Sequence, residues 1–365
     1  MTQKETRIGI VGANAKASWA KVSHVPAING LPGLKLAAVA TRNKQSAREA
    51  AYTFGAERWF SDPFAMIRDD RIDIVTIAVK VPAHRELVLA ALEAGKAVYC
   101  EAPLGRTVPE TEEMASAVGS FHTAIGLQGR LNPAVRRAAQ LLSSGKIGRP
   151  LNARIVSTNV GFGPELPSNY DYFNKTSSGA NLLTINAGHT LDLVEAVLGA
   201  IVEVDGRTEI LWPAVKLTDI GEESLRETAD HVTVLGKTRS SAVFTADIHG
   251  GVAPEGARSS FEIRGSEGWL SLTSSHPYSF QAGDLKLTSN VAFVAPDEAA
   301  VSGGFMGAAI NVGEVYAHLV RDIHAGTYVT PGFEHALHNA RLIEAVRRAA
   351  ERGERQKVTS QDLEQ

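Results

Sequence analysis

"IGIVGANAKASWA", residues 8–20, is the stretch that decides how the first part of the chain folds. An apolar run ends at Gly12 and a segment compatible with a helix follows, which is the order of a strand, a tight turn and a helix that cradle a pyrophosphate. Such a turn normally reads G-x-G-x-x-G, and Asn14 stands at its second glycine. Asparagine tolerates a positive φ, and a left-handed Asn14 would cost about 1 kcal/mol. We predict that Gly12, Ala13 and Asn14 hold a dinucleotide; the alternative is an ordinary strand–helix turn.

The first third of the chain continues this pattern, because short apolar runs alternate with helical periodicity. Six strands joined by crossovers make a complete doubly wound parallel sheet, a Rossmann domain, over residues 1–127, with the expected strand order 3-2-1-4-5-6. The predicted strands are Arg7–Val11, Leu34–Ala40, Ala56–Phe60, Asp73–Val79, Ala97–Glu101 and Thr123–Leu127.

Residues 128–365 behave differently, since many strands follow one another with few helices between them. This pattern predicts an α+β domain with a large, mostly antiparallel open sheet. Its strands are expected at Leu151–Thr158, Val202–Ile210, Ala229–Leu235, Ser241–Ile248, Ser260–Arg264 and Trp269–Leu272. Its helices are expected near Ala134–Ser143, Ala187–Leu198, Val312–His324 and Phe333–Arg352.

Composition narrows the class of protein. The formal net charge of −3 over 365 residues, with no run of Lys and Arg, argues against direct binding to a nucleic-acid backbone. One cysteine, Cys100, excludes an internal disulfide and fits a reducing compartment. No apolar stretch is long enough to span a bilayer, and no secretory signal is visible. We expect a cytoplasmic protein without membrane contact.

The end of the second strand should select the cofactor. A carboxylate there binds the ribose of NAD, whereas an arginine accommodates the 2′-phosphate of NADP. The chain reads "AVATRNK", with Thr41, Arg42 and Lys44 and no acid. We predict NADP as the preferred cofactor and NAD as the alternative; a solvated surface turn would carry the same charges.

Longer motifs connect the chain to a known family. "AHRELVLAALEAGKA" (83–97) followed by "VYCEAPLGRTVPE" (98–110) resembles the Gfo/Idh/MocA oxidoreductase family, as do "AGHTLDLVEAVLG" (187–199) and "PGFEHALHNARLIEAV" (331–346). The loop G-x-N-A, then W-A and H-x-P-A-I, is similar to the subgroup that contains the fungal galactose-regulon repressor and its bacterial relatives. The resemblance covers nearly the whole chain.

This resemblance implies a catalytic set that the chain carries incompletely. The family's E-K-P motif reads Glu101, Ala102, Pro103, so its lysine is missing. His189 matches the histidine that exchanges a proton in the family, but the acid four residues earlier is Ile185. Lys80, after the fourth strand, is a candidate to replace the missing lysine. Further cofactor contacts are expected from Trp19, Ala78, Val79, Glu101 and Ala102.

Substrate contacts are expected from Arg130, Tyr172 and Asn186, and no metal site is predicted. The alternative for Arg130 is an ion pair, and for Trp19 an indole packed between helix and sheet. An uncovered apolar sheet face predicts a homodimer or homotetramer. Two functions stay open: an oxidoreductase acting on a sugar or polyol derivative with His189 as acid and base, or a dinucleotide-binding sensor with little turnover.

Overall fold

The chain forms two compact units in a computed structural model that describes residues 5–16, 18–297, 299–300 and 307–358. Unit 1 comprises Met1–Gln128 and Ala299–Leu337, and unit 2 comprises Gly129–Glu298 and His338–Gln365. The predicted second range, 128–365, therefore contributes residues to both units.

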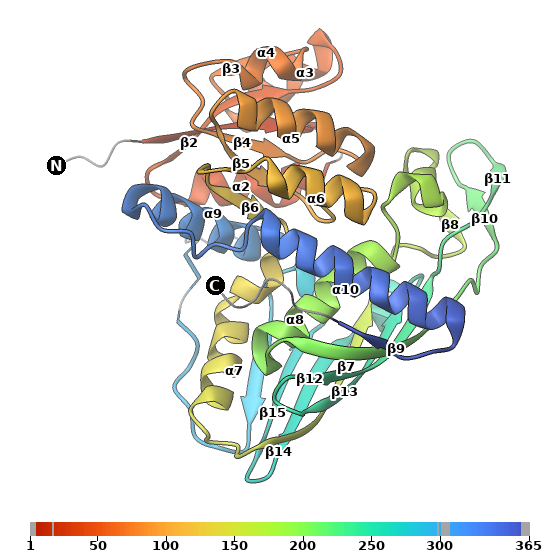
Figure 1. The fold of residues 1–365 in the computed structure, drawn as a ribbon. Helices are drawn as coiled ribbons and strands as arrows, with labels where there is room; N and C mark the ends of the chain where they lie inside the picture. Colours follow the sequence, from red (N-terminus) through yellow and green to blue (C-terminus); the bar gives the residue numbers. More distant parts are fainter. Residues whose placement is uncertain (1–4, 17, 298, 301–306, 359–365) are drawn as a thin grey trace. The chain divides into compact units, whose positions relative to one another are not determined.

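Unit 1 is built on a six-stranded parallel sheet (Figure 1). Its order, β3-β2-β1-β4-β5-β6, confirms the doubly wound topology expected from the sequence. The strands are β1 (Thr6–Val11), β2 (Leu34–Ala40), β3 (Arg58–Phe60), β4 (Ile74–Ile77), β5 (Ala97–Cys100) and β6 (Thr123–Ile125). Strands β1, β4 and β5 are almost entirely buried, as expected for a parallel sheet covered on both faces.

The helices of unit 1 begin at short polar side chains. Asn43 accepts a hydrogen bond from the Ser46 backbone at the start of α3, and Thr107 does the same for Glu110 at the start of α6. Gly55 ends α3 with a φ of 73°, a conformation that favours glycine. Within residues 1–128, the helices of unit 1 are α1 (Trp19–Val22), α2 (His24–Gly30), α3 (Lys44–Phe54), α4 (Pro63–Ile67), α5 (His84–Glu93) and α6 (Val108–Ser116).

The C-terminal part of the chain returns to unit 1. Helix α9 (Ala308–Ala325) packs on α2, and the segment after it continues the edge of the sheet. The Ile125 amide donates to the Pro331 carbonyl at 2.9 Å, and the Phe333 amide donates to the Thr123 hydroxyl at 3.3 Å. Residues far apart in sequence therefore complete the first domain.

Unit 2 contains an eight-stranded sheet of order β16-β15-β14-β7-β13-β12-β9-β17. Neighbouring strands are antiparallel except for β7 and β13, which confirms the predicted mostly antiparallel sheet. The strands are β7 (Pro150–Thr158), β9 (Ile201–Glu209), β12 (His231–Thr238), β13 (Val243–His249), β14 (Ser259–Gly265), β15 (Trp269–Ser274), β16 (Lys286–Ser289) and β17 (Gln356–Lys357). A separate small sheet, absent from the sequence prediction, joins β8 (Glu165–Leu166), β10 (Ala214–Leu217) and β11 (Glu222–Leu225).

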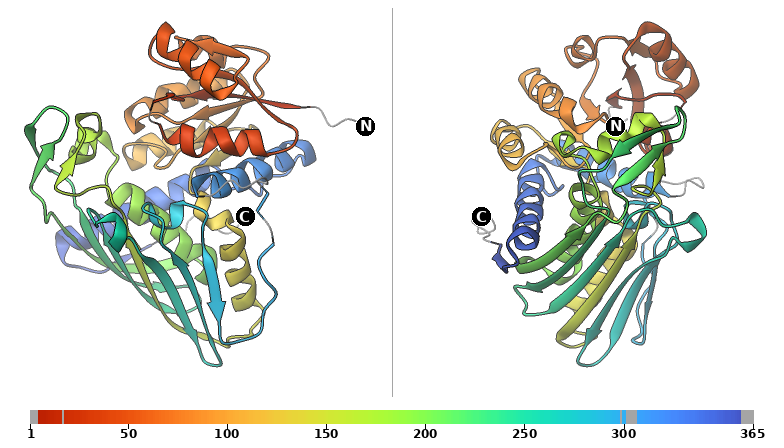
Figure 2. Two further views of the ribbon diagram at one scale, coloured as in Figure 1. Left: turned by 180° about the vertical axis from the view of Figure 1, so that it is seen from behind. Right: turned by 90° about the vertical axis from the view of Figure 1, so that its right-hand side faces the viewer.

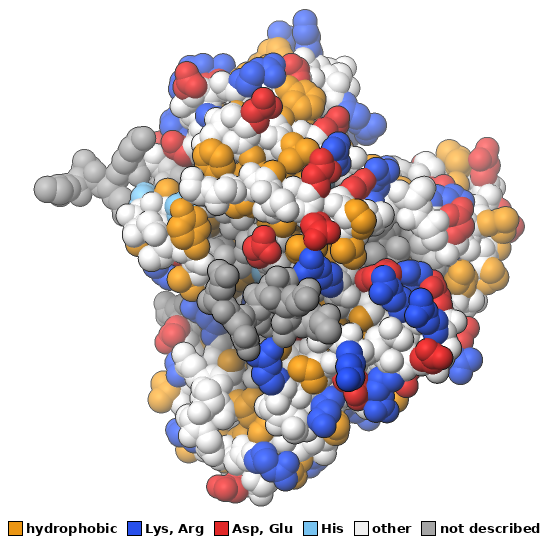
Figure 3. All heavy atoms as spheres, in the orientation of Figure 1, with side chains coloured by type: hydrophobic (Ala, Val, Ile, Leu, Met, Phe, Trp, Pro, Cys, Tyr) orange, Lys and Arg blue, Asp and Glu red, His pale blue; other side chains and the backbone are white. Residues whose placement is uncertain are grey.

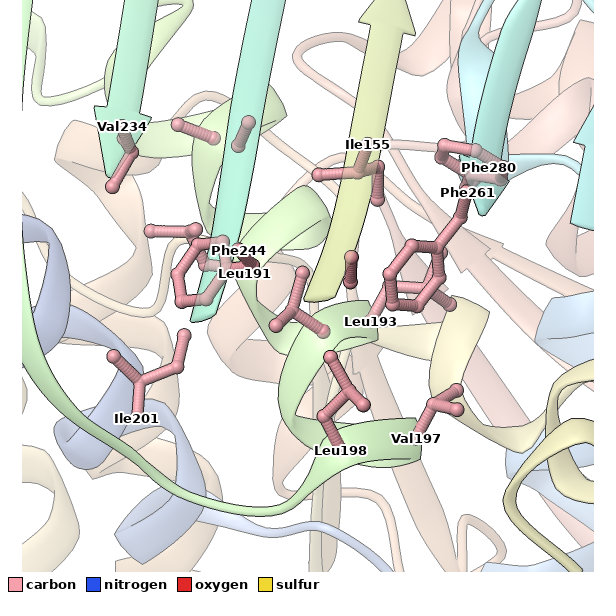
Figure 4. Packing of buried hydrophobic residues seen from close by; sticks show 14 of the residues in the cluster. Ile155, Leu191, Leu193, Val197, Leu198, Ile201, Val234, Phe244, Phe261 and Phe280 are labelled. Atoms are coloured by element: carbon pink, nitrogen blue, oxygen red, sulfur yellow. The ribbon is translucent and has the colours of Figure 1, made fainter. Parts of the chain in front are cut away.

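One face of the large sheet packs on helices and the other is bare. Helices α7 (Pro133–Ser143) and α8 (Gly188–Leu198) cover the inner face, together with the second part of α10 (Phe333–Arg352) (Figures 1 and 2). Figure 4 shows Leu191 and Leu198 of α8 packed among Phe244 and Ile155 of the sheet. In the described part of unit 2 no helix lies over the outer face (Figure 2).

The surface carries charges of both signs. On α10, Arg347 and Arg348 both pair with Glu344, and Figure 3 shows basic and acidic side chains interspersed on this side. Within the described residues no helix combines the length and apolar character that a membrane crossing requires.

Candidate functional site

The turn after β1 has the geometry of a phosphate-binding loop. Gly12 has a φ of 101°, and a Cβ placed on it would lie 2.2 Å from the Ala78 carbonyl oxygen and 2.9 Å from Cγ1 of Val79. The Gly12 amide donates to the Ala40 carbonyl at 3.0 Å. Only glycine fits between the ends of β2 and β4, which leaves the backbone of the turn open to a ligand. The predicted contact residues Gly12, Ala78 and Val79 therefore do meet.

The conformation expected for Asn14 is wrong. Among the described residues, the positions with positive φ other than glycine are Phe162, Ser241 and Ser279, so Asn14 is not left-handed. Its side chain instead accepts a hydrogen bond from the Lys16 amide at 2.8 Å. A short polar side chain thus closes the turn locally, and no second glycine is needed.

Two other residues of this loop, Ala13 and Trp19, were predicted to contact the cofactor. Ala13 is fully buried, so it can offer a ligand only its backbone. Trp19 is half-buried at the first position of α1, after Ser18, whose hydroxyl accepts from the Lys21 amide.

The end of β2 offers hydroxyls and cations. The Thr41 hydroxyl lies 2.6 Å from the Ser46 hydroxyl at the start of α3. Arg42 and Lys44 are exposed, and neither forms an ion pair within the described residues. No carboxylate occurs over residues 41–46. Free cations beside a helix N-terminus suit a phosphate group better than the neutral ribose hydroxyls of NAD.

A buried chain of hydrogen bonds ends on Glu101. Nε2 of His24 lies 2.8 Å from Oε1 of Glu101, and Nδ1 of His24 lies 2.9 Å from the Tyr316 hydroxyl. That hydroxyl lies 2.8 Å from the Thr76 hydroxyl. A neutral His24 satisfies every member when it donates to Glu101 and accepts from Tyr316, which in turn accepts from Thr76.

This chain holds Glu101 in place at the carboxyl end of β5. The ring of Tyr99 packs edge-on against both His24 and Tyr316, with ring centres 5.0 Å apart in each case. Burial raises the pKa of Tyr316 well above its ordinary value, so its hydroxyl keeps its proton. The side chain of Glu101 remains 15% exposed, and a Cβ on Gly126 would lie 2.9 Å from its Oε2. One oxygen of Glu101 is therefore anchored by His24, while Gly126 leaves room beside the other.

The turns after β4 and β5 are tied together by His84. Its Nε2 lies 3.0 Å from the Val79 carbonyl oxygen, and its Nδ1 lies 3.1 Å from that of Leu104. Burial lowers the pKa of His84, so the ring is neutral and its one N–H serves one side at a time. Ile77 pairs with Cys100 in register, and exposed Lys80 follows β4 as Ala102 follows β5. Lys80 and Ala102 thus leave the sheet from adjacent strands.

In unit 2, His189 lies in the first turn of α8, directly after a π-helix over Leu183–Ala187. Such wide turns are frequent at functional sites because they re-aim side chains. Asn186 lies in this turn; its Oδ1 is buried and has no hydrogen-bond partner within the described residues. His189 is half-buried.

Arg130 is engaged within unit 2. Its Nη1 lies 2.5 Å from Oδ1 of Asp192, and the side chain of Asp192 is only 2% exposed. Of the two interpretations of Arg130, a substrate contact or an ion pair, the ion pair is present. Pairing with a buried carboxylate fixes the guanidinium next to α8.

Two side chains of helix α10 form hydrogen bonds with α8. Asn339 donates from Nδ2 to the Gly188 carbonyl at 3.0 Å, and Nε2 of His338 lies 2.8 Å from Oε2 of Glu195. Burial alone would lower the pKa of His338, but the hydrogen bond to Glu195 and the attraction of the Glu195 and Asp192 carboxylates together outweigh it, so the pKa is raised. The position of His189 therefore depends on contacts at both ends of α8.

An aromatic segment before α8, residues 162–174, is anchored by Arg226, a residue that the sequence alone did not indicate. This fully buried guanidinium donates to the carbonyl oxygens of Phe162 and Gly163, at 2.6 and 2.8 Å, and to the Asn174 side chain at 3.0 Å. It also pairs with Asp230 at 2.8 Å. Tyr172 packs on Phe173 in this segment, and burial raises the pKa of its hydroxyl. Hydrogen bonds from Arg226 and aromatic packing therefore hold this segment in place.

Two comparisons by sequence place this arrangement among known proteins. Residues 6–125 match the model of the oxidoreductase family with an NAD-binding Rossmann fold, GFO_IDH_MocA, and residues 133–274 match that of the Gal80p C-terminal domain. The dehydrogenase aclE of Aspergillus oryzae is 30% identical over 252 residues, covering 66% of this chain and 69% of that protein. The galactose/lactose metabolism regulatory protein GAL80 of Kluyveromyces lactis is 30% identical over 215 residues, covering 54% of this chain and 46% of that protein.

Solved structures agree on the fold. A super-repressor mutant of Gal80p from Saccharomyces cerevisiae superposes with a TM-score of 0.85 at 22% identity, covering 98% of this chain and 99% of that one. Levoglucosan dehydrogenase in complex with NADH and L-sorbose superposes with a TM-score of 0.82 at 24% identity, covering 98% and 100%. At these identities the likeness concerns the fold alone.

Proposed function

Because the chain belongs to the Gfo/Idh/MocA family of oxidoreductases, we propose that it is an NAD(P)-dependent oxidoreductase acting on a sugar or polyol derivative. The observation that carries the proposal is the turn at Gly12, where the Ala78 carbonyl excludes any side chain and leaves the backbone free for a pyrophosphate. Levoglucosan dehydrogenase and D-apiose dehydrogenase among the relatives are named for sugar substrates, which supports this class.

The residues present fit a dinucleotide. Backbone groups of Gly12, Ala13 and Asn14 would hold the pyrophosphate, and Thr41 and Arg42 would hold the adenosine end. When bound, the nicotinamide ring supplies the hydride acceptor or donor. Because Arg42 has no carboxylate partner among the described residues and residues 41–46 contain no acid, we propose NADP as the preferred cofactor.

His189 is proposed to exchange the proton of the substrate hydroxyl. It lies half-buried at the start of α8, its helix is braced by Asn339, and imidazole titrates near neutral pH. Asn186 and the Arg130–Asp192 pair are proposed to contact substrate hydroxyls, since sugars are recognised by several fixed donors and acceptors.

The experiment combines binding with turnover. Calorimetry with NADPH and NADH should show tighter binding of NADPH, and Arg42→Ala should remove this preference; equal affinities in the parent protein would refute it. A panel of sugars, polyols and sugar acids is then tested for NADP reduction. For an active substrate, His189→Asn should lower kcat by about 10²–10⁴-fold with unchanged cofactor affinity. Tyr52→Phe, which alters an almost fully exposed side chain, serves as the control.

A regulatory role is the second candidate, and one departure from the family favours it. Ala102 replaces the lysine of E-K-P, and residues 133–274 match the C-terminal domain of Gal80p, a name also borne by regulatory proteins among the relatives. Tight dinucleotide binding without turnover on the whole panel would favour this role over the oxidoreductase.

A further inference from the structure

The outer face of the large sheet carries a cluster of two histidines and one aspartate. Asp247 and His249 lie two residues apart on β13, and His231 on β12 pairs with His249 in register. Because side chains at positions i and i+2 of a strand share a face, all three point to the outer side. Among the described residues, this is the one group of three His, Cys, Asp or Glu side chains with ligand atoms within 4.8 Å of one another.

The ligand atoms of the three side chains lie close together. Nε2 of His231 lies 2.8 Å from Oδ1 of Asp247, and Nε2 of His249 lies 2.9 Å from Oδ2 of Asp247. The two imidazole rings stack with centres 4.4 Å apart. A zinc ion holds ligand atoms at about 2.0–2.2 Å, so neighbouring ligands in a tetrahedral site lie about 3.3 Å apart. Small side-chain rotations therefore suffice to admit an ion.

The chemistry of the cluster also suits a cation. Asp247 offers both carboxylate oxygens, and each lies within hydrogen-bond distance of one imidazole nitrogen. Glu209 on β9 pairs with His231 on its other side and adds a second exposed carboxylate to the same row. Two imidazoles with a carboxylate favour borderline transition metals over Mg²⁺ or Ca²⁺.

We propose that His231, Asp247 and His249 form a binding site for a divalent transition metal such as Zn²⁺ on the outer face of the sheet. Nε2 of each imidazole would present its lone pair to the ion, and the ion would replace the two hydrogen bonds to Asp247. Water completes the coordination, because Glu209 is paired with Arg207. The proposal is independent of the function proposed above, since it involves none of the residues assigned to cofactor or substrate.

The test uses the protein of 365 residues in the oligomeric state in which it purifies, after removal of any polyhistidine tag and of bound metal. Calorimetric titration with Zn²⁺ should show one ion per chain, and Co²⁺ should give the visible absorption of a site with nitrogen ligands. His231→Gln and His249→Gln should each weaken Zn²⁺ binding at least about 10-fold, because even losing a partner behind a metal ligand commonly costs 10–100-fold. Both side chains are partly exposed, and circular dichroism checks that the variants fold.

His122→Gln is the matched control, because it removes a partly buried histidine of unit 1. It should leave the Zn²⁺ affinity unchanged, whereas Asp247→Asn should weaken it as the histidine variants do. Absence of stoichiometric binding to the parent protein overturns the proposal. Equal affinity in the parent protein and in His249→Gln overturns it as well, since the ion would then be held elsewhere.

Discussion

Replacing Gly12 by alanine tests whether steric conflict excludes a side chain from this position of the phosphate-binding turn. Gly12→Ala places a methyl group 2.2 Å from the Ala78 carbonyl oxygen, on a residue whose φ is 101°. A side chain in so sparsely populated a region costs about 1–3 kcal/mol, and forcing extra atoms into a packed site costs about 1–3 kcal/mol more. We expect a loss of about 2–6 kcal/mol in the free energy of unfolding, with dinucleotide binding lost because β4 must move.

Gly33→Ala is the matched control for this prediction. Gly33 also has a positive φ, 79°, but a Cβ on it would meet nothing within 4 Å. Its replacement should cost only the backbone strain, about 1–2 kcal/mol, and leave dinucleotide affinity intact. The smaller entropy of the unfolded chain is common to both variants and cancels in their difference. Urea denaturation gives both stabilities and calorimetry gives both affinities; equal losses and equal affinities would refute the reasoning.

Four further predictions concern both units. Arg226→Ala should cost about 3–5 kcal/mol of stability because it leaves Asp230 buried and unpaired; Arg207→Ala, which breaks an exposed pair with Glu209, should cost at most about 1 kcal/mol in the same denaturation assay. The raised pKa of His338 stabilises the fold fully below about pH 6.5, and this contribution is lost as pH rises through the folded-state pKa; stability curves of His338→Gln should lack that decline, and an identical pH dependence would contradict the assignment. Lys80→Met should lower turnover by about 100-fold with NADP affinity nearly intact if Lys80 replaces the lysine missing at Ala102; an unchanged kcat rejects this. Light scattering should report a homodimer or homotetramer, because Leu235 and Val243 of the bare sheet face are 58% and 50% exposed; a monomer at micromolar concentration rejects that interface, and Leu235→Glu should weaken a true one.

Local patterns in the sequence were sufficient to predict the parallel sheet of unit 1 and the mostly antiparallel character of the large sheet of unit 2, but not the small sheet of β8, β10 and β11. The alternation of apolar runs and helical segments predicted the six-stranded order of unit 1, and the bounds of Phe333–Arg352 agree with the structure to the residue. The glycine at position 12 is required by its two nearest neighbours in space, both of which belong to the predicted sheet. Periodicity and turn chemistry act over a few residues, so they can be read without tertiary contacts.

Contacts between distant residues were decided by the tertiary structure alone. His24 and Tyr316 are separated by 292 positions, and nothing in either segment indicates that α9 packs on α2 and completes the chain that anchors Glu101. The conformation of Asn14 depended on whether its side chain could reach the Lys16 amide, which residue type alone does not decide. The cluster of His231, Asp247 and His249 likewise depends on the register of two strands, because a shift of one residue would send one strand's side chains to the opposite face. Side-chain chemistry is written in the sequence, but which side chains meet depends on packing over the whole chain.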